Sequence, residues 1–158
     1  MIRVLFVCLG NICRSPMAEA VFRHLLEEAG LAHRFEVDSA GTSGWHEGEP
    51  PCGGTRRVLR REGIALGRKL ARQVSSLELS QWDYVIAMDR ENLAALRRLD
   101  RRGTSTTRYH LLMEFAPDLG YRDVPDPYYE GNFELVYRLV RAGCEGLLEH
   151  IRRREGLA

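Results

Sequence analysis

The sequence has no long hydrophobic run. Its apolar stretch nearest the N-terminus covers residues 4–9, which is too short to span a membrane. The same stretch lacks a small-residue cleavage site and is followed at once by a Gly-Asn turn. We therefore expect a buried strand there, rather than a signal peptide or an anchor, and no membrane partner.

An excess of charge of either sign is also missing. The chain of 158 residues has 23 basic and 22 acidic residues, so its formal net charge is +1. No overall field then attracts a nucleic acid or an anionic membrane, and we predict neither as a partner. Lysine is nearly absent, since Lys69 is the only one. We attribute this bias toward arginine to genome composition or thermal adaptation.

Cysteine is scarce as well. The four cysteines, at positions 8, 13, 52 and 144, are too few in a chain of this length for a secreted disulfide framework. We therefore expect a reducing, cytoplasmic compartment. None of the five histidines has metal-ligand spacing or lies near a motif, so we expect packing or surface roles for them and predict neither a metal nor a cofactor.

Strands and helices alternate along the chain. Strands are predicted at residues 2–7, 34–39, 82–88 and 108–113. Helices are predicted from an N-cap at Ser15 to Gly30, at 54–62, at 89–100 and at about 132–153, with a long loop over 114–132. This order predicts an α/β fold: a single three-layer domain over residues 1–158, with a four-stranded parallel sheet and helices on both faces.

The loop VCLGNICRSP, residues 7–16, follows the first predicted strand and opens the first helix. Backbone N–H groups and the helix N-terminus make such a loop an anion site. It has no lysine, which excludes a Walker A nucleotide cradle. Arg14 would fold over a tetrahedral anion and hold Cys8 as a thiolate facing phosphorus. The alternative is that Cys8 merely ends a strand and Arg14 is a solvated surface residue.

The chain resembles the low-molecular-weight protein tyrosine phosphatases. The resemblance rests on five segments in the family's order and spacing: VCLGNICRSPMAEA (7–20), DSAGTSGWHEGEPP (38–51), ARQV (71–74), DYVIAMDREN (83–92) and DPYY (126–129). C-x5-R alone occurs in several phosphatase folds, whereas its combination with the late DPYY is highly specific. The resemblance covers almost the whole chain.

The resemblance implies hydrolysis of phosphotyrosine and aryl phosphate monoesters through a cysteinyl-phosphate. Cys8 would be the nucleophile, and Arg14 would bind and stabilise the transferring phosphoryl group. Asp126, between two prolines that stiffen its backbone, would be the general acid. The phosphate-binding residues would be Leu9, Gly10, Asn11, Ile12, Cys13, Arg14 and Ser15. Ser15 would also stabilise the thiolate as a leaving group, a role compatible with helix capping.

Other residues would support this site. Asn11 would shape the loop with help from Ser39, although it is also an ordinary turn residue. Asp89 would be a buried supporting carboxylate, or only a helix cap. The substrate ring would lie in a slot walled by Trp45, Tyr128 and Tyr129, unless the two tyrosines serve loop packing instead. The implied partner is a phosphotyrosine protein or a small aryl phosphate, bound by a monomer or weak dimer.

Several alternatives stay open. The same fold and loop can serve arsenate reduction, but that chemistry needs further cysteines near the third strand, and residues 75–130 contain none. A catalytically inactive phosphate-binding module is a third reading, and a phosphoarginine or a phosphorylated metabolite is an alternative substrate. Many family members carry histidine near the position of Lys69, so a network that such a histidine supports is in doubt here.

The two cysteines of the loop predict redox sensitivity. Both ends of a loop around one phosphate lie close, plausibly within the ~4.4–6.8 Å Cα separation of a disulfide. Cys13 is therefore expected to trap peroxide-oxidised Cys8 as a reversible disulfide. The alternative is that Cys13 is a small, buried packing residue.

Overall fold

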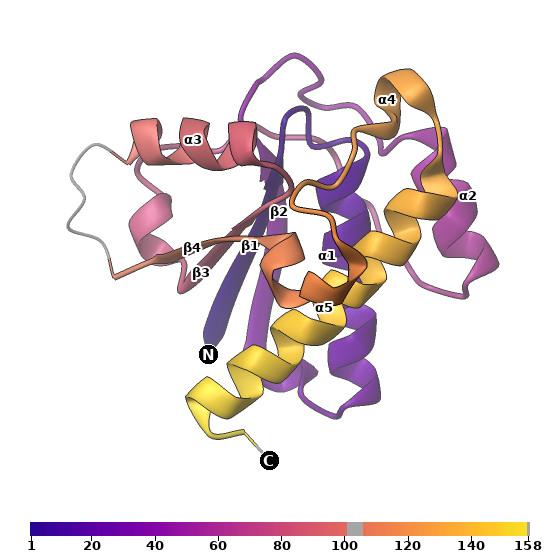
Figure 1. Ribbon diagram of the computed structural model, residues 1–158. Helices are drawn as coiled ribbons and strands as arrows, with labels where there is room; N and C mark the ends of the chain where they lie inside the picture. The colour runs from indigo at the N-terminus through magenta and orange to yellow at the C-terminus, as the bar shows by residue number, and fades with distance from the viewer. Residues whose placement is uncertain (101–105, 158) are drawn as a thin grey trace.

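A four-stranded parallel sheet forms the centre of the protein, as the computed structural model in Figure 1 shows. The structure describes residues 1–100 and 106–157, apart from the side chains of residues 129 and 130. The strands are β1 (Ile2–Cys8), β2 (Phe35–Gly41), β3 (Tyr84–Ala87) and β4 (Arg108–Leu111). They lie in the order β2-β1-β3-β4, and every neighbouring pair is parallel.

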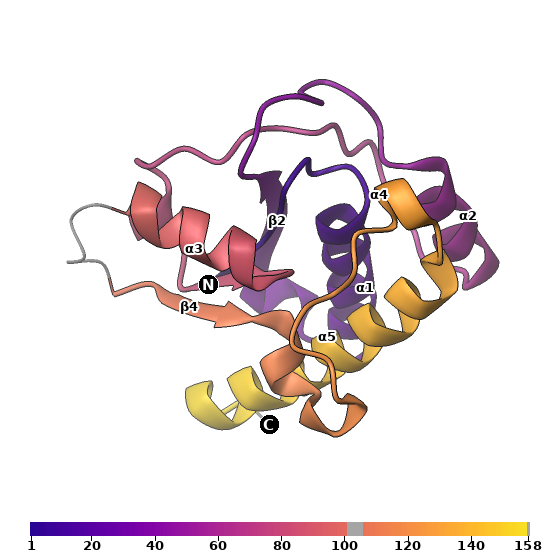
Figure 2. The same cartoon turned by 45° about the horizontal axis from the view of Figure 1, so that its top comes forward.

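Helices cover both faces of the sheet. They are α1 (Arg14–Glu28), α2 (Gly53–Arg61), α3 (Arg90–Leu99), α4 (Pro127–Glu130) and α5 (Phe133–Glu155). Figure 2 shows α3 on one side of the sheet and α1, α2 and α5 gathered on the other. Because side chains alternate along a strand, Phe6 packs in the core beneath α1 and α5, whereas Val7 packs with Leu96 of α3. The predicted three-layer α/β fold is confirmed.

Two details of the predicted elements were wrong. The segment predicted as a long loop contains α4 and the short 3-10 helix Pro117–Leu119, and another 3-10 helix, Leu112–Phe115, replaces the end of the strand predicted at 108–113 and enters this segment. The first helix begins at Arg14, so Ser15 lies inside it and is not its N-cap. The Ser15 hydroxyl is instead turned toward Cys8, with 3.0 Å between Oγ and Sγ. None of the helices among the described residues is long and apolar enough to cross a membrane.

Parallel pairing brings the carboxyl ends of the strands to one edge of the sheet, where ligand sites of such folds lie. The loop after β1 and helix α4 both lie at this edge (Figure 1). The end of β2 is in close contact with that loop, because a Cβ atom on Gly41 would lie only 2.7 Å from the carbonyl oxygen of Leu9. A side chain at position 41 would therefore displace the loop.

Candidate active site

Cys8, the last residue of β1, has its sulfur inside the loop that follows. The backbone N–H of Asn11 donates a hydrogen bond to Cys8 Sγ at 3.3 Å, and Ser15 Oγ lies 3.0 Å from the same atom. Cys8 is only 3% exposed and is not part of a disulfide. A backbone N–H and a hydroxyl therefore lie against a free sulfur, an arrangement that suits a nucleophile.

The backbone of the loop is oriented by hydrogen bonds from outside. Four loop carbonyls, those of Cys8, Leu9, Ile12 and Cys13, accept bonds from Thr42 N, Ser43 N, Cys52 N and Thr55 Oγ1, respectively. A trans peptide places its N–H opposite its C=O, and the described chain has no cis peptide. The next amides therefore point inward. The loop forms a cradle of N–H donors of the kind that binds oxyanions.

Asn11 holds the cradle in shape. Its backbone is left-handed, with φ 56°, which asparagine tolerates better than most residues. Its Nδ2 donates to Ser15 Oγ and Ser39 Oγ, both at 2.9 Å. Arg72 N donates to its Oδ1 at 3.0 Å, which fixes the orientation of the amide. Ser15 accepts from Asn11 and can therefore direct its own hydroxyl proton to Cys8.

Arg14 closes the cradle from the helix side and is only 2% exposed. Its NH1 donates to Asp89 Oδ2 at 2.7 Å and to the carbonyl oxygen of Val124 at 2.9 Å. Burial lowers the pKa of Arg14, but the charge of Cys8 and the hydrogen bond to Asp89 outweigh burial and raise it above its ordinary value. Asp89 also accepts from Asn92 N, so this one carboxylate both caps α3 and anchors Arg14.

Asp126 borders the same cavity, on the segment that leads into α4. Its Oδ1 accepts from Tyr128 N at 3.1 Å and caps that short helix. Its Oδ2 lies 3.4 Å from NH2 of Arg14. With its side chain 29% exposed, it remains open to solvent and to a leaving group. The structure thus brings together the three residues predicted to be catalytic, Cys8, Arg14 and Asp126.

Rings form the mouth of the cavity. Trp45 and Tyr128 line it as predicted, but they are 76% and 51% exposed and form an open rim rather than a deep slot. The side chain of Tyr129 lies outside the described part of the chain. His46, for which we expected a packing or surface role, lines the cavity too and faces Tyr128, with ring centroids 5.4 Å apart. The sequence did contain a signal for this role of His46, because the residue lies within the family segment DSAGTSGWHEGEPP next to Trp45.

Cys13 has an unexpected partner. It forms a disulfide with Cys52, with 5.1 Å between the Cα atoms, and not with Cys8. The pairing of Cys13 with Cys52 was not among our expectations, which paired Cys13 with Cys8. The two cysteines are 39 residues apart in sequence, and nothing in the local pattern indicates that Cys52 returns to the loop. The hydrogen bond from Cys52 N to the Ile12 carbonyl brings it there.

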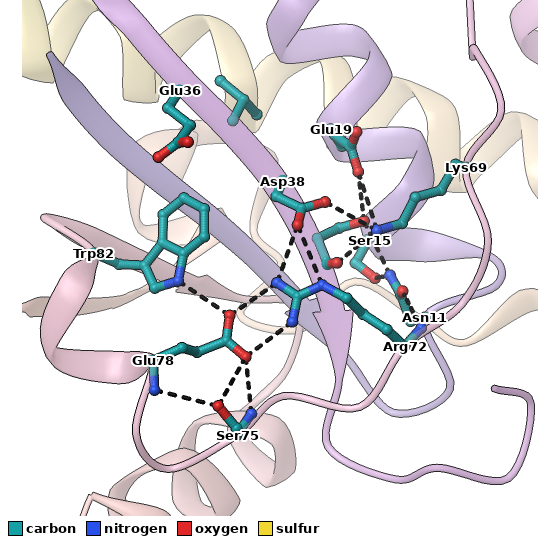
Figure 3. A network of polar contacts seen from close by, with 12 residues as sticks. Asn11, Ser15, Glu19, Glu36, Asp38, Lys69, Arg72, Ser75, Glu78 and Trp82 are labelled. Atoms are coloured by element: carbon teal, nitrogen blue, oxygen red, sulfur yellow. Dashed lines mark hydrogen bonds and ion pairs between the residues drawn. The ribbon is translucent and has the colours of Figure 1, made fainter. Parts of the chain in front are cut away.

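Lys69 takes part in the hydrogen-bond network that supports the loop. Because many family members carry histidine near this position, the sequence had placed such a network in doubt. Its Nζ donates to the Ser39 carbonyl at 2.7 Å and to Asp38 Oδ1 at 3.0 Å. Glu19 accepts a hydrogen bond from the Ser39 hydroxyl at 2.6 Å and lies 3.6 Å from Lys69 Nζ. Figure 3 shows that these side chains form one continuous network with Asn11 and Ser15. A lysine therefore ties the two carboxylates to Ser39.

The network continues outward to Glu78. Arg72 donates to Asp38 and, through NH1 and NH2, to both oxygens of Glu78 at 2.8 Å (Figure 3). Burial raises the pKa of Glu78, but the hydrogen bonds from Arg72 and the Ser75 backbone outweigh burial and lower it to about 2. Asp38 is shifted in the same direction: burial raises its pKa, but Lys69, the Ser39 backbone and Arg72 together outweigh burial and lower it.

This shift predicts an acid-sensitive fold. Because the pKa of Glu78 is lower when folded than its ordinary 4.5, its stabilising effect is complete above that value and is lost as pH falls toward about 2. Solvent screening at this partly exposed site reduces the full effect of ~3 kcal/mol to ~1 kcal/mol. We expect Glu78→Gln to lower the free energy of unfolding at pH 7 by this amount, and by less than half of it at pH 3.

Urea denaturation at both pH values measures this difference. Glu27→Gln is the matched control, because Glu27 is exposed and its charge should contribute equally little at both. An equal loss for Glu78→Gln at pH 7 and pH 3 would contradict the assignment.

Sequence comparison relates the chain to one family of known proteins. Residues 3–156 match the family described as low molecular weight phosphotyrosine protein phosphatase. The chain is 52% identical over 157 residues to the low molecular weight protein-tyrosine-phosphatase YfkJ of Bacillus subtilis, covering 99% of this chain and 100% of that protein. A low molecular weight protein-tyrosine-phosphatase of Streptomyces coelicolor is 48% identical, with 99% and 98% covered.

Solved structures lead to the same family. The crystal structure of YfkJ from Bacillus subtilis matches with a TM-score of 0.94 at 52% identity, covering 98% of this chain and 97% of that chain. The agreement spans the whole sheet and its helices, so it is not confined to the Cys8 loop. The chain therefore belongs to the low molecular weight phosphotyrosine protein phosphatase family.

Proposed function

We propose that this protein hydrolyses phosphotyrosine and other aryl phosphate monoesters through a cysteinyl-phosphate intermediate. The observation that carries the proposal is that Cys8, Arg14 and Asp126 border one cavity whose base is a cradle of backbone amides. The inward amides and Arg14 are preorganised for the negative charge of a transferring phosphoryl group. The predicted cytoplasmic location and monomeric or weakly dimeric state stay predictions.

In the first step the Cys8 thiolate attacks phosphorus and the bond from phosphorus to the aryl oxygen breaks. Asp126, protonated at this stage, gives its proton to the departing phenolate. Its hydrogen bond from Tyr128 N holds the carboxyl group in place, while its exposure leaves Oδ2 accessible. A fixed carboxyl with a mobile proton suits general acid catalysis.

In the second step water attacks the cysteinyl-phosphate. Asp126, now a carboxylate, takes a proton from that water as the new oxygen–phosphorus bond forms and the sulfur–phosphorus bond breaks. The hydroxyl of Ser15 and the N–H of Asn11 stabilise the leaving thiolate of Cys8. Inorganic phosphate departs and the starting state of the site returns.

Substrate choice follows from the depth of the nucleophile and the rings at the mouth. Cys8 is buried, whereas Trp45 and Tyr128 stand at the rim. A phenyl phosphate has a rigid stem that spans this depth and contacts the rings, while the stem of phosphoserine is short. We expect kcat/KM for a phosphotyrosine peptide to exceed that for the matched phosphoserine peptide by ~10²-fold or more, since groups that fill an apolar site discriminate on that scale.

A phosphate-release assay on phosphotyrosine, phosphoserine and phosphoarginine peptides, with a chelator present, tests the proposal. Activity should persist with the chelator, because Arg14 and the amides supply the charge stabilisation that bound cations give elsewhere. Equal turnover of the serine and tyrosine peptides would refute the role of the rim. A preference for phosphoarginine would refute the substrate class, and loss of activity with the chelator would refute the proposed charge stabilisation.

A further inference from the structure

One half of the Cys13–Cys52 disulfide borders the cavity of the nucleophile. Cys13 lines the same cavity as Cys8, while its disulfide partner Cys52 lies at the entrance to α2. Cys8 itself remains a free thiol. The oxidised bond is therefore held by the two cysteines that do not attack phosphorus, and the attacking sulfur is reduced.

The sulfurs of Cys8, Cys13 and Cys52 differ in how easily an oxidant or a thiol from solvent can reach them. Cys8 and Cys13 are each 3% exposed, whereas Cys52 is partly exposed. Cys13 and Cys52 occupy the N-cap positions of α1 and α2. A small oxidant can enter the open cavity to Cys8, and an external thiol can reach the disulfide from the side of Cys52.

We propose that Cys13 and Cys52 form a reducing dithiol for Cys8, so that the phosphatase site also reduces hydroperoxides. The proposal rests on Cys8 being the reactive thiolate of the proposed function. The structure then corresponds to the end of one cycle, with Cys8 restored and the dithiol oxidised. Cys144 takes no part, because it is fully buried in α5.

The chemistry proceeds in three balanced steps. The Cys8 thiolate attacks a hydroperoxide, the O–O bond breaks, and a Cys8 sulfenic acid and an alcohol or water result. The Cys13 thiolate attacks that sulfur, a Cys8–Cys13 disulfide forms, and the sulfenic hydroxyl leaves with a proton as water. The Cys52 thiolate then attacks Cys13 Sγ, which forms the Cys13–Cys52 disulfide and expels the Cys8 thiolate. An external dithiol reduces this disulfide and becomes oxidised.

The proposed steps require Cys13 to lie between Cys8 and Cys52, so that its sulfur can bond to either. Its Cα lies 5.1 Å from that of Cys52, and it also lines the cavity that contains Cys8. In the reduced protein its sulfur is released from Cys52, and rotation about the Cα–Cβ bond redirects it. One side chain can thus exchange between two partners, as thiol–disulfide exchange demands.

The test begins with fully reduced protein treated with one equivalent of hydrogen peroxide. Samples are quenched over time with N-ethylmaleimide and mapped by mass spectrometry under non-reducing conditions. We expect the parent and the Cys144→Ala control to show alkylated Cys8 and a Cys13–Cys52 disulfide. Cys52→Ser should stop at a Cys8–Cys13 disulfide, with its aryl phosphatase activity lost until a dithiol is added.

The decisive variant is Cys8→Ser. If peroxide enters through Cys8, this variant should form the Cys13–Cys52 disulfide at least ~10-fold more slowly than the parent, because the most reactive thiolate is gone. Equal rates would mean that the pair oxidises directly, and the relay would be wrong. Accumulation of Cys8 sulfinic acid in Cys52→Ser, without a Cys8–Cys13 bond, would also overturn it.

These readouts are independent of phosphate chemistry. If the disulfides exchange as expected but the reduced parent hydrolyses no aryl phosphate, only the proposed phosphatase function fails. If hydrolysis proceeds while the disulfide forms without Cys8, only the relay fails.

Discussion

Replacing Cys8 with serine should abolish the hydrolysis of aryl phosphates, with a loss in kcat of at least ~10⁴-fold, as removal of a covalent nucleophile does elsewhere. The serine hydroxyl is smaller and is not ionised at neutral pH, so no anionic nucleophile faces phosphorus. The cradle itself should survive, because the loop carbonyls are held by donors outside the loop. Phosphate binding should therefore persist in the variant.

Two measurements check this expectation. Steady-state turnover of p-nitrophenyl phosphate gives the loss in kcat, and calorimetric titration with inorganic phosphate shows whether the cradle still binds. Cys144→Ala is the control, since Cys144 is a buried thiol in α5 that does not line the cavity. Turnover by Cys8→Ser within ~10-fold of the parent would show that another group attacks phosphorus, because such a small loss is below that of a missing nucleophile.

The second large effect concerns Asp126. Asp126→Asn should slow esters with strongly basic leaving groups by ~10²–10⁴-fold, the usual contribution of a general acid. Activated esters such as p-nitrophenyl phosphate should lose much less, since their phenolates leave without a proton. Asparagine keeps an oxygen that can accept from Tyr128 N, so the cap of α4 should remain.

A series of substituted phenyl phosphates measures this effect as the slope of log(kcat/KM) against leaving-group pKa. The slope should become steeper in Asp126→Asn and stay unchanged in Asp118→Asn, whose carboxylate is exposed in a short helix outside the site. A uniform loss across the series would instead indicate that Asp126 acts by positioning Arg14.

Most of the candidate site could be predicted because its residues are local in sequence. The strand ending at Cys8, the loop and the helix that follows are one continuous segment, and Arg14 lies six positions from Cys8. Asp126 is remote, but its two flanking prolines and the adjacent tyrosines made it recognisable. Strands β1 and β3 were predictable because they are continuous apolar runs, as strands buried on both faces are.

The features that could not be predicted are contacts between segments that are distant in sequence. The Cys13–Cys52 bond requires two segments to meet, and no periodicity encodes that meeting. His46 lines the cavity because Gly10 lets its ring approach; a Cβ on Gly10 would lie 2.9 Å from His46 Cδ2. Glu19 and Lys69 were hidden because charged residues on a helix and a loop are usually solvated. Only the fold shows that they face each other.

The network around Lys69 has a consequence for chemical labelling. The chain contains 22 arginines and a single lysine, and the lysine side chain is only 8% exposed, between Asp38 and Glu19. In the native protein the N-terminal amine is therefore the one readily accessible target for amine-reactive reagents. Acylation of Lys69 requires the contacts behind Ser39 to open. Its labelling rate is thus a built-in, single-site reporter of how often the contacts that support the loop open.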